Sequence, residues 1–168
     1  RNGWVDVEDG RVVAVGADGE TPTRIVRGEC AILPGLVNAH THLEFSGLDR
    51  PIASPDGTFA GWVGAVVAHR QGRGSATCGD MTADIVRGAH ELVSGGSGYV
   101  GDIVTTDSYP ELPVRGTAFH EVLGLGRQDV ATRLRDAELR LNRPTTAATT
   151  WGLSPHAPYS CTLNSGRR

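Results

Sequence analysis

No segment of this sequence is apolar for long enough to cross a lipid bilayer. The longest strongly apolar run, from about Ala60 to Ala68, falls far short of the roughly 20 residues that a membrane-spanning helix needs. Basic residues are not in excess either, because 16 Lys and Arg stand against 19 Asp and Glu, which gives a formal net charge of -3. Since no Lys or Arg cluster is present, we expect neither a nucleic acid nor a membrane surface as a partner.

Cysteine is also scarce. The three cysteines, at positions 30, 78 and 161, are odd in number and widely spaced, so they predict no disulfide framework. Proteins without disulfides are typical of reducing compartments, and we therefore expect a cytoplasmic protein. The composition that is present, 39% hydrophobic and 21% charged residues, is that of a globular chain with enough length for one ordinary domain and its core.

Two kinds of local pattern follow one another along the chain. Residues 4–15 predict a β-hairpin, because Asp9–Gly10 is flanked on both sides by runs rich in valine. A short strand is expected around Ile25, followed by a Pro34–Gly35 break and a second strand from about Leu36.

After this strand the periodicity changes to that of helices alternating with strands. Apolar residues recur at helical spacing in three segments, which predict helices. Two apolar runs lie between the second and third of these segments and predict strands. A further strand is predicted after the third, where a Thr-Trp pair begins an apolar segment. Strands that alternate with helices are connected by crossovers and form a parallel sheet, so the fold class is α/β. The expected helices cover about 59–67, 85–93 and 130–141, and the expected strands cover 99–107, 115–124 and the segment that begins near Thr150.

The most informative polar residues are His40 and His42, which end the strand that begins near Leu36. Residues i and i+2 of a strand point to the same face, so both imidazoles can reach one metal ion. Their position at the C-terminal end of a parallel strand is also that of active sites in barrel enzymes. Taken without its surroundings, a His-x-His pair is equally compatible with two structural or hydrogen-bonded surface histidines.

The surrounding sequence is specific. The segment ILPGLVNAHTHLEFS (32–46) resembles the signature of the amidohydrolase superfamily, in its branch of chlorohydrolases and amine deaminases, and the late segment GLSPHAPYS (152–160) resembles that family's fourth barrel strand. The resemblance implies a partial (β/α)8 TIM barrel, about strands 1–4, preceded by part of a small β-sandwich. The expected domains are therefore 1–33, a partial N-terminal β-sandwich, and 34–168, the first half of a metal-dependent hydrolase barrel.

The resemblance also implies roles for individual residues. His40 and His42 would bind a divalent metal ion, zinc in the first place and iron as the alternative. His156, which matches the histidine at the end of the family's fourth strand, would bind the substrate. Arg70, on the helix after the metal strand, and Glu121, near the end of a later strand, are further candidates for substrate binding. Trp62 is expected in the core, and Glu44 either orients the ligands or lies exposed.

The remaining ligands and the catalytic groups of the family would lie beyond residue 168. They are a histidine on strand five with a glutamate three residues later, a histidine on strand six and an aspartate on strand eight. Two histidines are fewer than the three protein ligands of a catalytic zinc. We therefore expect this chain to be a truncated and inactive portion of a longer enzyme, without catalytic residues of its own.

The implied activity is that of a metal-dependent hydrolase of carbon–nitrogen bonds other than peptide bonds. Within its branch the sequence is most similar to aminodeoxyfutalosine and adenosine-type deaminases. Metal-activated water would then deaminate a small molecule, an amino-purine nucleoside or a related heterocycle. The alternatives are dehalogenation of the chlorohydrolase type and a non-catalytic binding module built on a half barrel. The sequence leaves open whether the full-length protein forms a homo-oligomer.

Overall fold

The fold was analysed in a computed structural model, which describes residues 3–17, 29–73, 78–122 and 130–157. The chain divides into two compact units, Arg1–Pro34 and Gly35–Arg168, which are considered separately. The strand expected around Ile25 lies outside the described residues.

The first unit contains the hairpin that the sequence predicts. Strands β1 (Gly3–Glu8) and β2 (Arg11–Ala17) pair antiparallel. The turn residues Asp9 and Gly10 have φ angles of 48° and 73°. A tight hairpin turn of this type requires positive φ at both central positions, which Asp tolerates and Gly adopts without strain. That the hairpin forms part of a β-sandwich stays a prediction.

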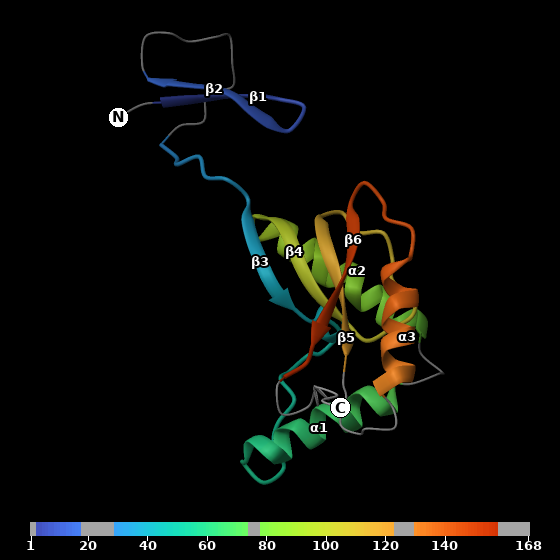
Figure 1. The fold of residues 1–168 in the computed structure, drawn as a ribbon. Coiled ribbons are helices and arrows are strands. Elements are labelled where there is room, and N and C mark those ends of the chain that lie inside the picture. Colours follow the sequence, from blue (N-terminus) through green and yellow to red (C-terminus); the bar gives the residue numbers. More distant parts are fainter. Residues whose placement is uncertain (1–2, 18–28, 74–77, 123–129, 158–168) are drawn as a thin grey trace. The chain divides into compact units, whose positions relative to one another are not determined.

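The second unit is built on a four-stranded parallel sheet in the order β3-β4-β5-β6 (Figure 1). The order in the sheet follows the order along the chain, so the α/β alternation expected from the sequence is confirmed. Strand β4 begins two residues earlier than expected because Leu36 pairs with Ser97, which only two residues separate from the end of the preceding helix at Ser94. The strands are β3 (Leu36–Thr41), β4 (Ser97–Val104), β5 (Arg115–Val122) and β6 (Thr149–Pro155).

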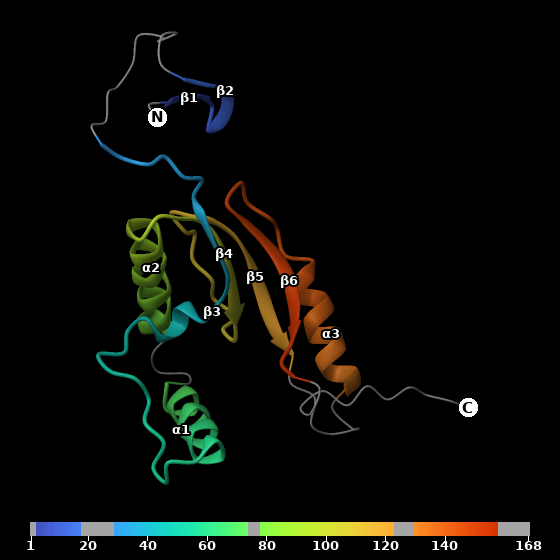
Figure 2. The ribbon, with the colours of Figure 1, turned by 90° about the vertical axis from the view of Figure 1, so that its left-hand side faces the viewer.

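Three α-helices and one short 3-10 helix accompany the sheet. The helices are η1 (Leu43–Phe45), α1 (Phe59–Gly72), α2 (Cys78–Ser94) and α3 (Val130–Leu141). The three expected helices are thus confirmed. Helix α1 begins at a side-chain cap, in which the Thr58 hydroxyl accepts the Gly61 N–H at 2.9 Å. Helix α2 packs on η1 and β4, and α3 packs on β5 and β6 (Figure 2).

The core lies between α2, η1 and β4. It includes Leu43, only 2% exposed, which directly follows His42. Burying a leucine stabilises the fold by about 1.5–3 kcal/mol, so this contact ties the end of the histidine strand to α2. The core cluster consists of Leu43, Ile85, Ala89, Val100, Leu112 and Val114.

Helix α1 departs from the expectation for its apolar stripe. Trp62 was expected in the core but is 43% exposed, and no residue of α1 is buried. The Trp62 ring stacks on Phe59 at a centroid distance of 5.8 Å. The other apolar residues of the predicted stripe include Phe59, Val63 and Val67, which are also 38–68% exposed, so the described part of the chain leaves much of it uncovered. None of the helices in the described ranges is long and apolar enough to span a membrane.

The close approach of β3 and β4 yields a test of the fold. A Cβ atom added at Gly101 would stand 2.6 Å from the backbone oxygen of Ala39. Because backbone cannot move aside cheaply, Gly101→Ala is expected to lower the free energy of unfolding by about 1–3 kcal/mol. The control is Gly64→Ala in α1, where an added Cβ meets nothing within 4 Å. That change should raise stability by about 0.5–1 kcal/mol. Urea unfolding measures both, and equal effects of the two substitutions would contradict the close contact between β3 and β4.

Candidate functional site

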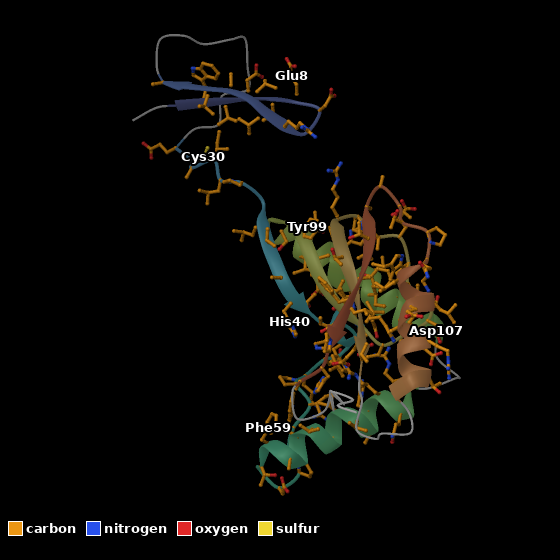
Figure 3. All side chains as sticks on the ribbon, viewed as in Figure 1. Glu8, Cys30, His40, Phe59, Tyr99 and Asp107 are labelled. Atoms are coloured by element: carbon orange, nitrogen blue, oxygen red, sulfur yellow. The ribbon has the colours of Figure 1, made fainter. Side chains whose placement is uncertain are left out.

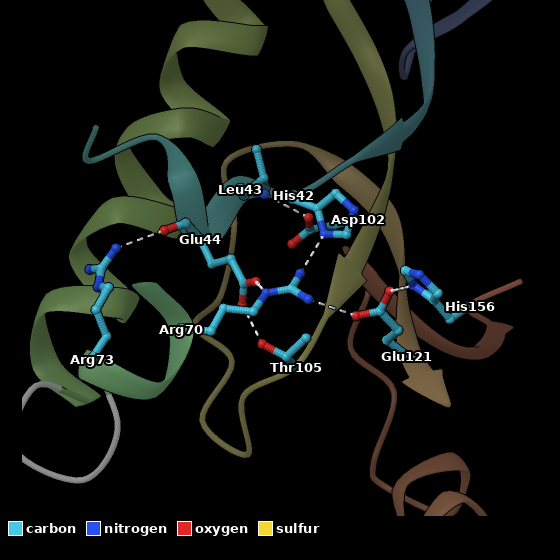
Figure 4. A network of polar contacts seen from close by, with 9 residues as sticks. All are labelled: His42, Leu43, Glu44, Arg70, Arg73, Asp102, Thr105, Glu121 and His156. Carbon is cyan, nitrogen blue, oxygen red and sulfur yellow. Dashed lines mark hydrogen bonds and ion pairs between the residues drawn. The ribbon is translucent and has the colours of Figure 1, made fainter. Parts of the chain in front are cut away.

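Polar side chains gather where the strands of the parallel sheet end. His40 and His42 come from the end of β3, Thr105 follows β4, Glu121 lies near the end of β5 and His156 follows β6. The carboxyl ends of parallel strands lie at one edge of the sheet, which is where α/β enzymes place their active sites. Figure 3 shows His40 at this edge, and Figure 4 shows the polar network beside it.

The two histidines of β3 lie close together. Their ring centroids are 5.4 Å apart and their planes meet at 77°. His40 is exposed, whereas His42 is half-buried. Burial, and after it the positive charge of Arg70, lowers the pKa of His42 below its ordinary value. The neutral imidazole, which is the form that binds metals, is therefore favoured at His42.

Arg70 reaches from α1 into the centre of the network (Figure 4). Its Nε donates to Glu44 Oε1 at 2.9 Å, and its Nη1 donates to Glu121 Oε2 at 3.1 Å. The two carboxylate side chains are only 5% and 3% exposed. A buried carboxylate without a cation is unfavourable by several kcal/mol, and Arg70, which pairs with both acids, offsets part of that cost.

The third contact of Arg70 defines the state of His42. Its Nη2 lies 3.2 Å from His42 Nδ1. Arginine has donors and no acceptor, so Nδ1 must accept, and a neutral ring then carries its proton on Nε2. Binding of a metal through Nε2 needs the proton on Nδ1 instead. In this arrangement, metal binding through Nε2 requires that Arg70 release Nδ1.

The pair Glu121 and His156 joins the far side of the network. Glu121 Oε1 lies 2.5 Å from His156 Nδ1. Burial raises the pKa of Glu121, but the hydrogen bond with His156 and the charge of Arg70 together outweigh it, so the pKa of Glu121 lies below its ordinary value. The ionised carboxylate accepts, and His156 therefore carries a proton on Nδ1.

The structure thus brings all five predicted site residues to one edge of the sheet. Their roles in binding metal and substrate stay predictions, because the contacts described are those of the protein with itself. In kind, the donors fit a divalent metal ion: two imidazoles whose ring centroids are 5.4 Å apart, and two buried carboxylates in the same network. In number they do not complete a site. Among the described residues, no group of three or more His, Cys, Asp and Glu side chains is arranged to hold a metal.

Several members of the site were not identified from the sequence. Thr105 donates to Glu44 Oε2 at 2.5 Å, and Arg73 donates to the Glu44 backbone oxygen at 3.0 Å. Glu44, for which the sequence left two readings open, is therefore buried and not exposed. Asp102 lies 1% exposed in β4 and accepts the backbone N–H of Leu43. The available signal for Asp102 was an acidic residue inside an otherwise apolar strand.

Comparison with known proteins finds relatives that are named as deaminases. The chain is 29% identical over 174 residues to the 5-methylthioadenosine/S-adenosylhomocysteine deaminase of Symbiobacterium thermophilum, an alignment covering 95% of this chain and 39% of that protein. It is 28% identical over 134 residues to the adenosine deaminase of Helicobacter pylori, covering 77% of this chain and 31% of that protein. The chain therefore spans well under half the length of these relatives.

Solved structures with a similar fold are triazine hydrolases. A mutant of the atrazine chlorohydrolase of Arthrobacter aurescens, complexed with zinc and atraton, superposes with a TM-score of 0.60 and 21% identity, covering 89% of this chain and 41% of that one. A triazine hydrolase variant gives a TM-score of 0.61 at 22% identity, covering 90% and 41%. At such identities the likeness concerns the fold alone.

The family itself is established by a profile match. The profile described as "Amidohydrolase family" matches residues 31–165, which includes the whole four-stranded parallel sheet and every residue of the candidate site. The match agrees with the resemblance carried by the segments around His42 and His156. This chain belongs to the amidohydrolase family.

Proposed function

We propose that the protein carrying this chain is a metal-dependent hydrolase that deaminates an amino-purine nucleoside or a related heterocycle. In this proposal the four parallel strands are the first half of a (β/α)8 barrel, and the hairpin belongs to a small β-sandwich. His40 and His42 bind a divalent metal ion, zinc before iron. A cytoplasmic location and a homo-oligomer stay predictions from the sequence.

One observation carries the proposal: the imidazoles of His40 and His42 stand at the carboxyl edge of the sheet, beside the buried carboxylates of Glu44 and Glu121. Two buried acids create a negative potential that favours a cation at this edge. A structural histidine pair would need no such surroundings. The zinc in the similar chlorohydrolase structure supports the choice of metal.

In the mechanism, the chain's own residues bind and orient. A bound divalent metal would supply hydroxide at neutral pH by lowering the pKa of water. His40 and His42 would hold the metal, and the neutral form favoured at His42 suits this role. Glu121 fixes the His156 ring by its contact with Nδ1, so that His156 meets the substrate in one orientation. Arg70 would contact the substrate only through N–H groups that do not already bond Glu44 or Glu121.

Dehalogenation is the second candidate function. It is favoured by the fold comparisons, in which triazine hydrolases match over 84–90% of this chain. Deamination is preferred because the sequence identity to the named deaminases, 28–29%, exceeds the 21–22% found for these hydrolases. Both reactions replace a leaving group on an electron-poor ring carbon by hydroxyl, so the same site suits either. A non-catalytic binding module is the third reading, and it would bind metal or ligand without turnover.

Metal binding separates the roles of two histidines. We expect His42→Ala to abolish stoichiometric zinc binding by the protein that carries this chain, because it removes a ligand. His156→Ala should keep the metal and lower kcat/KM by about 10–100-fold, because it removes a substrate contact. Metal content by atomic absorption, together with steady-state kinetics, measures both. His90→Ala, at an exposed position of α2, is the control and should change neither quantity. Equal metal loss in the two site variants would make His156 a ligand and contradict the assignment.

The leaving group distinguishes the candidate reactions. The same protein is assayed with adenosine, 5′-modified adenosines, aminodeoxyfutalosine, guanine and chlorotriazines, while ammonia and chloride are followed separately. We expect ammonia release from an amino-purine nucleoside, lost on removal of the metal by a chelator and restored by zinc. Release of chloride alone would support the chlorohydrolase reading. Metal binding without any turnover would support the binding module.

A further inference from the structure

The chain leaves the candidate metal site through the short helix η1, whose N-cap residue does not cap the helix with its side chain. Helix η1 begins at Leu43, and His42 is its N-cap residue, but the His42 side chain makes no cap hydrogen bond. The first N–H groups of a helix have no partner within the helix, and an N-cap side chain reaches only the second or third of them. A buried N–H at this point needs another acceptor, and Leu43 is only 2% exposed.

Asp102 of the neighbouring strand supplies that acceptor. Its Oδ1 accepts the Leu43 N–H at 2.9 Å, across a separation of 59 residues (Figure 4). The register places Asp102 opposite Thr41, the last residue of β3, and this pairing is preceded by a register shift between Asn38 and Thr41. The end of β3 is therefore irregular, and the regular sheet hydrogen bonds alone do not set the direction in which the chain continues.

A second contact fixes the carboxylate itself. The Tyr109 hydroxyl donates to Asp102 Oδ2 at 3.2 Å, and the Tyr109 ring meets Trp151 of β6 edge-on at a centroid distance of 5.6 Å. Both oxygens of Asp102 are thus engaged, one by the exit of β3 and the other by a residue that rests on β6. The position of the cap is set by three strands of the sheet.

The placement is unfavourable for a carboxylate. Asp102 is 1% exposed and makes no ion pair within the described ranges of the chain. Burial raises the pKa of Asp102 to about 7, against the hydrogen bonds from Leu43 and Tyr109, which lower it. A buried acid without a cation is destabilising, and a neutral residue could fill the same volume. What an apolar residue could not do is accept the Leu43 N–H.

We propose that Asp102 is a positioning residue for His42: by accepting the Leu43 N–H from the neighbouring strand, it fixes the backbone directly after His42 and so holds the His42 ring beside His40. The consequence for metal binding rests on the proposed function. The consequence for the ring does not, because the contacts of His42 with Arg70 and His40 exist in the metal-free protein.

The test compares variants with and without an acceptor in the protein that carries this chain. Asp102→Asn keeps an oxygen for Leu43, whereas Asp102→Leu removes it at similar volume. Ile103→Ala is the matched control: Ile103 is also buried in β4 but points to the opposite face, so it lowers stability without touching the cap. Thermal unfolding confirms that each variant is folded. Two quantities are then measured: the histidine ring nitrogen resonances of metal-free protein, with His42 assigned by its loss in His42→Ala, and the zinc dissociation constant by chelator competition.

We expect Asp102→Leu to shift or broaden the His42 ring resonances and to weaken zinc binding by about 10–100-fold. Asp102→Asn should restore both quantities to near the wild-type values, and Ile103→Ala should change neither. The proposal is overturned if Asp102→Leu leaves the His42 resonances as they are in Ile103→Ala. If Asp102→Leu does not fold, the asparagine variant decides, because altered His42 resonances in folded Asp102→Asn would also overturn it. A wild-type protein that binds no zinc would refute the proposed function, while the resonances would still decide the role of Asp102.

Discussion

The arrangement of the site depends on the ion pairs that Arg70 makes with Glu44 and Glu121. Helix α1 buries none of its residues, so apolar packing on the described sheet does not fix its position. The guanidinium provides the link instead, and it neutralises part of the charge of two buried acids. Without Arg70, the two carboxylates would keep only their contacts with Thr105 and His156. One side chain therefore connects helix α1, the two buried acids and His42.

Apolar contacts fix the segment that directly follows β3. Leu43 inserts into the core between α2 and β4, directly after His42. The rings are consequently mounted on a segment fixed at both ends, by β3 pairing before them and by the core after them. Such a support restricts the ring orientations, which is what a metal or substrate site requires from its surroundings.

The proposed function rests on family membership and on the geometry of the candidate site. The chain belongs to the amidohydrolase family, and the paired imidazoles support the proposal of metal-assisted hydrolysis. Discrimination between an amino group and chloride as the leaving group depends on the residues that surround the reacting carbon. In the proposed function, His156, which Glu121 contacts, is one of these residues. The contact of the protonated His156 Nδ1 with Glu121 holds the His156 ring in one orientation, as the proposed alignment of a substrate requires.

The sequence by itself determined the features that depend on neighbouring residues. Asp9–Gly10 specified the hairpin turn, helical spacing specified the three helices, and the order of segments specified a parallel sheet. The His-x-His motif at a strand end, with its surroundings, indicated the family and the edge that bears the site.

Contacts between distant segments were decided only by the tertiary structure. The partners of Arg70 lie 26 and 51 residues away, and the acceptor of the Leu43 N–H lies 59 residues away. Periodicity shows which face of a helix is apolar but not whether another segment covers it, so the expectation of a buried Trp62 was wrong. Local patterns fix backbone conformation because they act through adjacent residues, whereas burial and ion pairing depend on which surfaces the folded chain brings together.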